Sequence, residues 1–242
     1  FRFKNSSVGQ RIGRVKIERI PESERTFEFD PSVFWKTRID TTFYTENERY
    51  LVERKYETKN ILPTSKYYIN SGSNATFKGG KSRIAIPVSL PRNTVEWCYQ
   101  FSASRSKEQI EKTKASFHLL ADLTKIIDET GLLGSGINSL TSPPGADICD
   151  VYLLDLDNSR LFLAKNEYQY YLTGSRESIK SGLIKMSEQA TSGDYLIGIK
   201  NPDSMHGVHV VIEVVAVVLL ETWGNREIEK YKTKSQEVPF LH

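Results

Sequence analysis

Cysteine is scarce in this chain: its 242 residues include only Cys98 and Cys149. Neither stands in a Cys-x-x-Cys pair or in a Cys/His spacing of the kind that binds zinc. Each lies in an apolar, strand-like run. Two alternatives follow: two buried free thiols, or one disulfide between Cys98 and Cys149, which requires an oxidising compartment.

Long apolar runs are also absent. The longest, Val214–Leu220, is far shorter than the roughly 20 residues of a membrane-spanning helix, so we predict a soluble chain without a transmembrane segment. The chain begins at Phe1 without a methionine, which indicates a processed N-terminus and favours an extracytoplasmic or secreted location.

The chain has no strong excess of charge of one sign. Its 33 basic and 30 acidic residues give a formal net charge of +3 and are mixed along the sequence. Proteins that bind nucleic acid usually gather basic residues on one face, so this composition does not favour a nucleic acid as the partner.

The motifs of several enzyme classes are missing. The sequence contains no GxSxG elbow, no HExxH, no GxxxxGK[ST] loop and no GxGxxG between a strand and a helix. Two of the four histidines, His206 and His209, are three residues apart, a spacing that puts them on opposite faces of a strand rather than around one metal ion.

Acidic pairs offer little more. Asp147 with Asp150, and Asp155 with Asp157, could hold calcium if a loop gathered them, but such residues are more typical of strand edges and turns. We therefore predict no catalytic residue, no metal site and no cofactor. A hydrolase with an unrecognised site is kept as an alternative.

The chain is rich instead in residues that suit β-strands, with 12 tyrosines and 11 phenylalanines. Alternation of apolar and polar residues, typical of a strand with one buried face, recurs in Arg38–Glu46, Val95–Phe101, Tyr195–Ile199 and Val208–Ala216. The turn-forming residues Lys200–Gly207 separate the last two, so we expect them to pair antiparallel.

One segment has a helical period. Between Ser106 and Thr130 apolar residues recur every three or four positions, Ser106 and Gln109 form a capping box, and Gly131 follows as a C-cap, so we predict a single helix over residues 106–130. We interpret Asp147–Lys165 as strand, turn and strand. Whether residues 177–190 form a short helix or an irregular strand stays open.

These patterns predict a mainly β protein, an antiparallel β-sandwich of jelly-roll type with one inserted amphipathic α-helix. We divide the chain into three parts. Residues 1–66 form a strand-rich N-terminal segment that can belong to the same domain, residues 67–224 form the sandwich with helix 106–130, and residues 225–242 form a charged C-terminal tail.

The best candidate for a recognition surface is the segment Asn166–Arg176. It gathers Tyr168, Tyr170, Tyr171 and Arg176, and tyrosine and arginine are favoured at recognition surfaces because they give large contact area at low entropy cost. The alternative is that Tyr168 and Tyr170 pack inward as one face of a strand.

Three blocks of the sequence, Ser82–Phe101, Ala146–Phe162 and Ser192–Val214, resemble the GOLD domain, the Golgi-dynamics β-sandwich. They follow its order of a Leu-Pro break, an aromatic strand, a strand that opens on Asp-Ile (here Asp147-Ile148) and a Gly-x-Tyr strand. In the cargo-receptor branch a disulfide joins the aromatic strand to the Gly-x-Tyr strand. Cys98 matches the first position, whereas Gly198 or its neighbours stand at the second.

The resemblance implies a GOLD-like sandwich that works as a non-catalytic module for protein or lipid-associated binding. We therefore expect a binding or assembly module whose partner is a protein. A carbohydrate-binding module, with a glycan as its ligand, is a further alternative.

Overall fold

The computed structural model describes residues 33–77, 79–127, 133, 136–187 and 191–240, together with residues 9, 12–16, 20 and 22–24. Two compact units divide the chain. The first comprises Phe1–Glu48 and Arg226–His242, and the second comprises Arg49–Asn225. The two longest strands, β1 and β8, contribute residues to both units.

Two four-stranded sheets form the sandwich of the second unit. The first sheet has the order β1-β8-β3-β6 and the second the order β2-β7-β4-β5. The pairs of β3 with β6 and β8, of β2 with β7, and of β4 with β5 and β7 are antiparallel. The strands are β1 (Phe34–Ile69), β2 (Arg83–Leu90), β3 (Thr94–Ser104), β4 (Cys149–Leu154), β5 (Tyr171–Ile179), β6 (Ser181–Met186), β7 (Gly193–Lys200) and β8 (Val208–Phe240). The predicted mainly β, sandwich class is confirmed.

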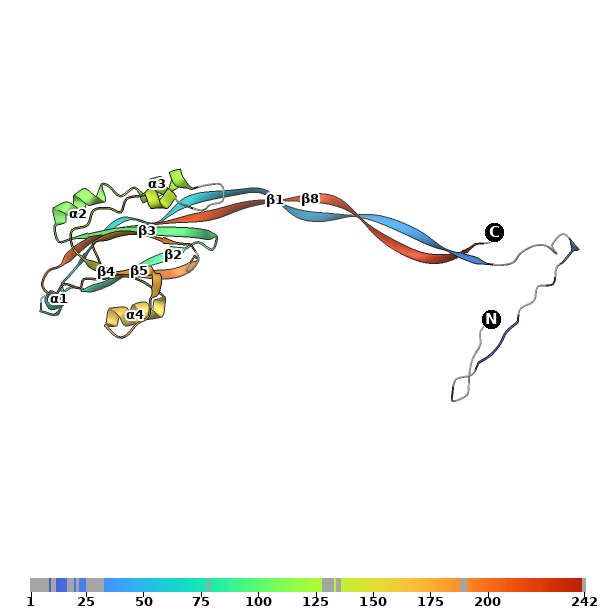
Figure 1. Cartoon of the computed structure of the whole chain (residues 1–242), viewed down its shortest axis with the longest axis horizontal. Coiled ribbons are helices and arrows are strands. Elements are labelled where there is room, and N and C mark those ends of the chain that lie inside the picture. The colour runs from blue at the N-terminus through green and yellow to red at the C-terminus, as the bar shows by residue number, and fades with distance from the viewer. Residues whose placement is uncertain are drawn as a thin grey trace. The chain divides into compact units, whose positions relative to one another are not determined.

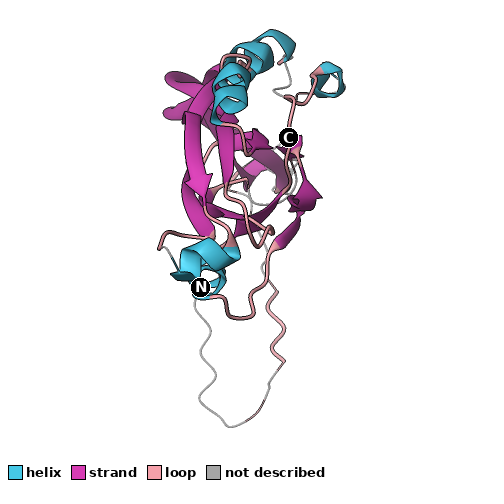
Figure 2. Cartoon of the chain, turned by 90° about the vertical axis from the view of Figure 1, so that its left-hand side faces the viewer, coloured by secondary structure: helices cyan, strands magenta, loops and turns pink. Residues whose placement is uncertain are grey.

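Short helices cover the outer faces of both sheets. In Figure 1, α2 and α3 lie on one side of the sandwich and α4 on the other, and Figure 2 shows the strands between helices. None of the helices in the described part of the chain is long and apolar enough to cross a membrane. The helices are α1 (Gly72–Phe77), α2 (Lys107–Lys114), α3 (Leu119–Ile126) and α4 (Leu156–Ala164), with a 3-10 turn, η2, at Gly136–Ser139.

The inner faces of the sheets enclose the main core. On β3 the rings of Trp97, Tyr99 and Phe101 follow one another at centroid distances of 5.9 and 6.2 Å, and all three are fully buried. Alternate residues of a strand share a face, so the sequence alternation predicted these rings correctly. Opposite them lie Val151 and Leu153 of β4 and Ile197 and Ile199 of β7.

β8 is buried on both faces from Val208 to Val218, which explains its nearly continuous run of valine. Val210, Ile212 and Val214 enter the inner core. Val211 packs against Ile110 and Phe117, and Val215 and Val217 pack with Leu119 and Leu123 of α3. A strand covered on both sides has no need of polar residues at alternate positions.

The predicted single helix over 106–130 is wrong: the segment forms α2 and α3. Between them, Ser116 N and Phe117 N donate to the carbonyls of Thr113 and Lys114, three residues earlier, at 2.9 and 3.2 Å. These tighter turns end α2. A new helix then starts because the buried Glu213 accepts hydrogen bonds from Leu119 N and Leu120 N at 3.2 and 3.5 Å. Residues 128–130 lie outside the described residues.

Other predicted elements also differ. Asp147–Lys165 is not strand, turn and strand: β4 is followed by α4, because Asp155 caps the helix by accepting from Asn158 N at 2.7 Å. The open segment 177–190 contains the end of β5 and all of β6, with residues 188–190 outside the described range. The predicted charged tail continues β8 as far as Phe240.

Replacement of Glu213 by alanine is expected to lower the free energy of unfolding by about 1–3 kcal/mol, because Gln100 Nε2, which donates to Glu213 at 3.0 Å, and Leu119 N would both lose a buried acceptor. Chemical denaturation measures the change. The control is Glu108→Ala, which removes only an exposed ion pair with Lys112 on α2 and should change stability by less than about 0.5 kcal/mol. Equal effects of the two variants would contradict the capping role.

His209 on β8 gives the fold a specific pH dependence. Its ring packs 4.8 Å from that of Tyr68, and burial, with Lys66 and Lys107 nearby, lowers the pKa of His209 below its ordinary 6.5, while Glu111 acts in the opposite direction. The neutral ring is therefore favoured in the folded state, and its stabilising contribution is complete above pH 6.5 and is lost as the pH falls below that value. Between about pH 7.5 and about pH 5.5, His209→Gln should lose less stability than the wild type in urea denaturation. His118→Gln is the control and should behave as the wild type does.

Candidate interaction surface

In the first unit β1 and β8 form a two-stranded ribbon, from Phe34 to Glu48 and from Arg226 to Phe240 (Figure 1). Residue numbers fall on β8 as they rise on β1, so the strands are antiparallel. The cross-strand side-chain contacts of this stretch join odd-numbered residues to odd-numbered ones and even-numbered residues to even-numbered ones, so each strand keeps one alternation and the ribbon has two well-defined faces. The contacts are Thr37–Glu237, Asp40–Gln236, Phe43–Tyr231, Tyr44–Lys232, Glu46–Lys230 and Glu48–Arg226.

The odd-numbered residues form what we call the apolar–acidic face. On β1 it carries an apolar row, Trp35, Ile39 and Phe43, which are 64, 64 and 62% exposed. Tyr231 of β8 is 66% exposed and its ring lies 6.2 Å from that of Phe43. The face contains three glutamates and no basic residue. Its members are Trp35, Thr37, Ile39, Thr41, Phe43, Thr45 and Asn47 on β1, and Glu227, Glu229, Tyr231, Thr233, Ser235, Glu237 and Pro239 on β8.

The even-numbered residues form the basic face, with six basic and three acidic side chains. Lys230 Nζ lies 2.6 Å from a carboxylate oxygen of Glu46, and this hydrogen bond lowers the pKa of Glu46. Lys232 Nζ lies 5.0 Å from the ring centroid of Tyr44. The charged members are Lys36, Arg38, Asp40, Glu46 and Glu48 on β1, and Arg226, Lys230, Lys232 and Lys234 on β8; the remainder are Phe34, Thr42, Tyr44, Ile228, Gln236 and Val238.

A ribbon of only two strands cannot bury its own apolar side chains. A two-stranded sheet is at best marginally stable in water and requires a further strand or a packed layer against one face. Among the described residues neither strand has a second neighbour along the ribbon, so each presents unpaired backbone donors and acceptors at an edge. The row of Trp35, Ile39 and Phe43 is therefore a surface suited to a packed partner.

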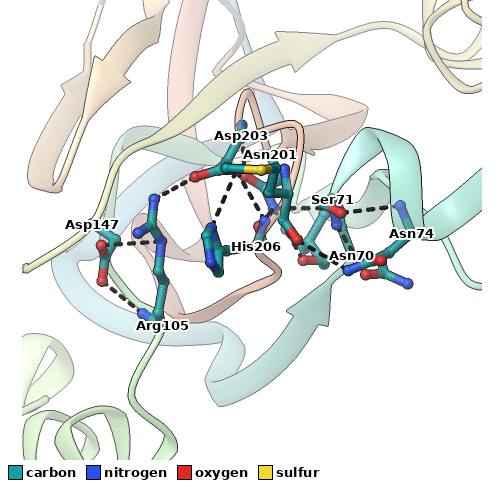
Figure 3. Close-up of polar contacts among 10 residues, drawn as sticks. Asn70, Ser71, Asn74, Arg105, Asp147, Asn201, Asp203 and His206 are labelled. Atoms are coloured by element: carbon teal, nitrogen blue, oxygen red, sulfur yellow. Dashed lines mark hydrogen bonds and ion pairs between the residues drawn. The ribbon is translucent and has the colours of Figure 1, made fainter.

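A polar cluster surrounds the loop between β7 and β8 (Figure 3). Asn201 Nδ2 donates to His206 O at 2.8 Å and to Asn70 O at 3.2 Å, while Asp203 Oδ1 accepts from Met205 N and His206 N at 2.6 and 2.9 Å. These bonds to backbone amides lower the pKa of Asp203.

Arg105 joins the same loop to the start of β4. Its guanidinium forms ion pairs with Asp203 and with Asp147, the latter at 3.4 Å, and Arg105 N donates to Asp147 Oδ2 at 2.7 Å. On the other side, Asn74 Nδ2 donates to Met205 O at 3.0 Å. The bonds of Asn74, Arg105 and Asn201 join separate segments of the chain, so the cluster fixes the loop to its neighbours (Figure 3).

The structure separates the predicted recognition residues. Tyr168 and Tyr170 pack around Tyr152 on the outer face of the second sheet, with ring centroids 5.5 and 4.9 Å from that of Tyr152. Tyr171 packs against the inner core and its ring lies 5.8 Å from that of Tyr195. Arg176 is exposed and donates to Ser175 O at 2.6 Å. Tyr170 and Tyr171 line a common pocket.

That pocket has a volume of about 200 Å³ and is also lined by Asp155, Asn158 and Gln169. Aromatic rings beside amide and carboxylate groups suit a sugar, but most of these polar groups have other partners. Asp155 Oδ1 and Oδ2 accept from Asn158 N and Asn158 Nδ2 at 2.7 and 2.8 Å, and Asn158 Oδ1 accepts from Gln169 N at 2.7 Å. The pocket is thus first of all the N-terminal cap of α4.

A second pocket, of about 350 Å³, is lined by Thr76, Lys81, Arg83 and Lys165 among others. Its arginine is already engaged: Arg83 donates to Phe162 O at 2.7 Å and its guanidinium lies 5.1 Å from the centroid of the Phe162 ring. The pocket also adjoins the carbonyl end of α4, which disfavours an anion.

The predicted acidic pairs do not form a metal site. Asp147 binds Arg105, Asp150 Oδ2 lies 3.1 Å from Lys200 Nζ, and Asp155 caps α4. Within the described residues there is no group of three or more His, Cys, Asp or Glu side chains that could hold a metal ion.

Both cysteines are free and buried. Cys98 faces outward from β3 into the cluster with Leu119 and Leu123, whereas Cys149 lies in the inner core. The two thiols are therefore on different sides of the first sheet, in agreement with the free-thiol alternative. Burial raises the pKa of Cys98, and burial raises that of Cys149 to about 12.

Comparisons with known proteins identify no relative: no family model, no curated protein and no solved structure matches the chain. The GOLD-like character therefore stays a prediction from the sequence blocks quoted above.

Sequence reasoning missed the ribbon faces. The prediction of Arg38–Glu46 as a strand with one exposed face is correct for the strand, but it left open whether residues 1–66 belong to the sandwich, and it did not pair this strand with the C-terminal segment. A usable signal was present: Trp35, Ile39 and Phe43 alternate with threonines, and Lys230, Lys232 and Lys234 alternate in what was predicted to be a tail. Alternation on both segments predicts a strand pair.

Under native conditions, iodoacetamide should label neither cysteine at a measurable rate, because both thiols are buried and their raised pKa values leave almost no thiolate. In denaturant without reductant, intact mass should show two labels. A disulfide between Cys98 and Cys149 would instead give labelling only after reduction.

Proposed function

We propose that this chain is a non-catalytic assembly module whose ribbon binds a second copy of the same chain through the apolar–acidic face. One observation carries the proposal: Trp35, Ile39, Phe43 and Tyr231 are each more than 60% exposed on one face of a ribbon that has only two strands. Burial of such a row in a partner is favoured by the hydrophobic effect.

The ribbon itself supplies the reason for choosing a second copy as the partner. With roughly 15 residues on each strand, the ribbon is about 50 Å long and about 10 Å wide, so one face offers about 500 Å². Contact between two such faces would bury about 1,000 Å² in total, near the lower limit for a specific interface. Every copy also carries, on its basic face, the charge that complements three glutamates.

The alternative functions have weaker support. A carbohydrate-binding module would use the pocket at Tyr170 and Tyr171, yet the carboxylate of Asp155 and the side-chain oxygen of Asn158 in that pocket already serve the α4 cap. A hydrolase would need acid and base groups that converge on a cleft, and the polar cluster around Asp203 is instead bonded to loop backbone.

The test replaces the apolar row by Trp35→Thr, Ile39→Thr and Phe43→Thr in the full chain. Threonine is chosen because it is polar and, as a β-branched residue, suits a strand. In multi-angle light scattering the wild type should have a mass of two or more chains of 27.6 kDa each, and the triple variant should have the mass of one chain. Leu172→Thr, at a 76% exposed position on β5 of the sandwich, is the control and should assemble as the wild type does. A monomeric wild type, or a triple variant that assembles normally, would sink the proposal.

A further inference from the structure

We infer that the copies assemble face to back: the apolar–acidic face of one ribbon packs on the basic face of the next. The inference rests on the proposed function, because it requires that ribbons bind one another. It adds which surface of the second copy receives the row of Trp35, Ile39 and Phe43.

The charges of the two faces are opposite. The apolar–acidic face carries Glu227, Glu229 and Glu237 without a basic residue, a net charge of −3, and the basic face carries six basic against three acidic side chains, a net charge of +3. The chain as a whole has a net charge of only +3 among 63 charged residues, so this separation is not a consequence of composition. Opposite fields on two faces favour their contact and disfavour the contact of like faces.

Ion pairs within the ribbon do not remove this difference in charge between the two faces. On the basic face, Glu46 and Glu48 are matched by Lys230 and Arg226, and Asp40 lies 2.8 Å from Arg38. Each acidic side chain of this face therefore has a basic partner, and the face as a whole keeps a positive excess.

Lys232 and Lys234 are part of that excess. Lys232 Nζ lies 5.0 Å from the centroid of the Tyr44 ring, and neither lysine forms an ion pair within the described residues. On the opposite face, Glu237 accepts a neutral hydrogen bond from Thr37 Oγ1 at 2.7 Å. Within the described chain, Glu227 and Glu229 have no ion-pair partner, so the negative charge of this face is also available to a partner.

Contact between two identical apolar–acidic faces would be poor. Depending on the orientation, the glutamates of β8 would meet the same glutamates of the second copy or would cover its apolar row. The first arrangement repels, and the second buries carboxylates against Trp35, Ile39 and Phe43 without a counter-charge, which is costly. A basic face has no such conflict, because its lysines reach the glutamates while Phe34 and Tyr44, 45 and 37% exposed, offer apolar contact to the row.

The face-to-back mode also uses more of the ribbon. Each copy would cover both of its faces, about 1,000 Å² per copy, against about 500 Å² if only like faces met. Because the two contacting surfaces differ, the interface is heterologous, and such interfaces generate closed rings or open filaments rather than symmetric dimers.

Charge reversal provides the test. Variant one is Glu227→Lys, Glu229→Lys and Glu237→Lys, which makes both faces positive. Variant two is Lys232→Glu and Lys234→Glu, which gives the basic face a small negative excess and leaves the Glu46–Lys230 and Glu48–Arg226 pairs intact. Each variant alone should be monomeric or at least tenfold weaker in assembly at low salt, where charge interactions are least screened.

An equimolar mixture should assemble again, because the positive apolar face of variant one fits the negative back of variant two, and the reverse pairing also holds. Native mass spectrometry should then show equal numbers of the two variants. The control, Lys81→Glu with Lys180→Glu in the sandwich, has the same charge change as variant two and should assemble like the wild type. Chemical denaturation of each variant confirms that the fold is kept.

The outcomes separate this inference from the proposed function. Assembly of the wild type without rescue in the mixture, or assembly of either variant alone at wild-type strength, would overturn the face-to-back mode and leave the assembly function standing. A wild type that stays monomeric would overturn both.

Discussion

Burial of extended backbone on both faces is the constraint on which this structure depends. From Val208 to Val218, β8 contacts the inner core with one set of alternate side chains and the α2 and α3 helices with the other. Glu213 lies on the helix-facing side of β8, and its burial there requires hydrogen-bond donors. Its carboxylate accepts from Gln100 and from the first amides of α3. A charged group at the centre of the sheet thus becomes the cap that holds a helix over it.

In the first unit the same two strands are exposed: among the residues that the structure describes, no helix or second sheet covers the ribbon. The residues there follow the strand alternation just as regularly, but what alternates is an exposed apolar row with glutamates against a mixed, mostly basic row. A strand pair that keeps two distinct faces over such a length is more typical of a surface that packs against a partner than of a linker. The proposed assembly follows from this contrast between a covered and an uncovered part of the same strands.

The alternation of apolar and polar residues predicted where strands form. Trp97, Tyr99 and Phe101 share a face of β3 as expected, but Val95, at a register shift between Thr94 and Glu96, packs with the outer cluster instead. The strands around Tyr195–Ile199 and Val208–Ala216 were predicted correctly, although β8 pairs with β3 rather than with β7. Which strands become neighbours depends on the packing of the whole sandwich, and no local pattern contains it. The same reason applies to Cys98 and Cys149, whose placement on two sides of one sheet the sequence left open.

The elements that were predicted wrongly depend on interactions that the sequence patterns do not show. The break between α2 and α3 depends on Glu213, which is far away in sequence, so the helical period appeared continuous. α4 is short, and its residues Leu161–Leu163 also fit a strand, while Asp155, which the sequence analysis grouped with residues typical of strand edges and turns, is a helix cap. Of the tyrosines, Tyr168 and Tyr170 lie before β5 and pack with the outer cluster, whereas Tyr171 packs against the inner core, which divides the predicted recognition surface although Tyr170 and Tyr171 line the same pocket.

Hydroxyl-radical footprinting across a range of protein concentrations tests the central claim most directly, since it reports the solvent exposure of Trp35, Ile39 and Phe43 themselves. The account predicts that their oxidation falls as concentration rises while that of Leu172 stays constant. Oxidation of the three residues that is high and independent of concentration would contradict it.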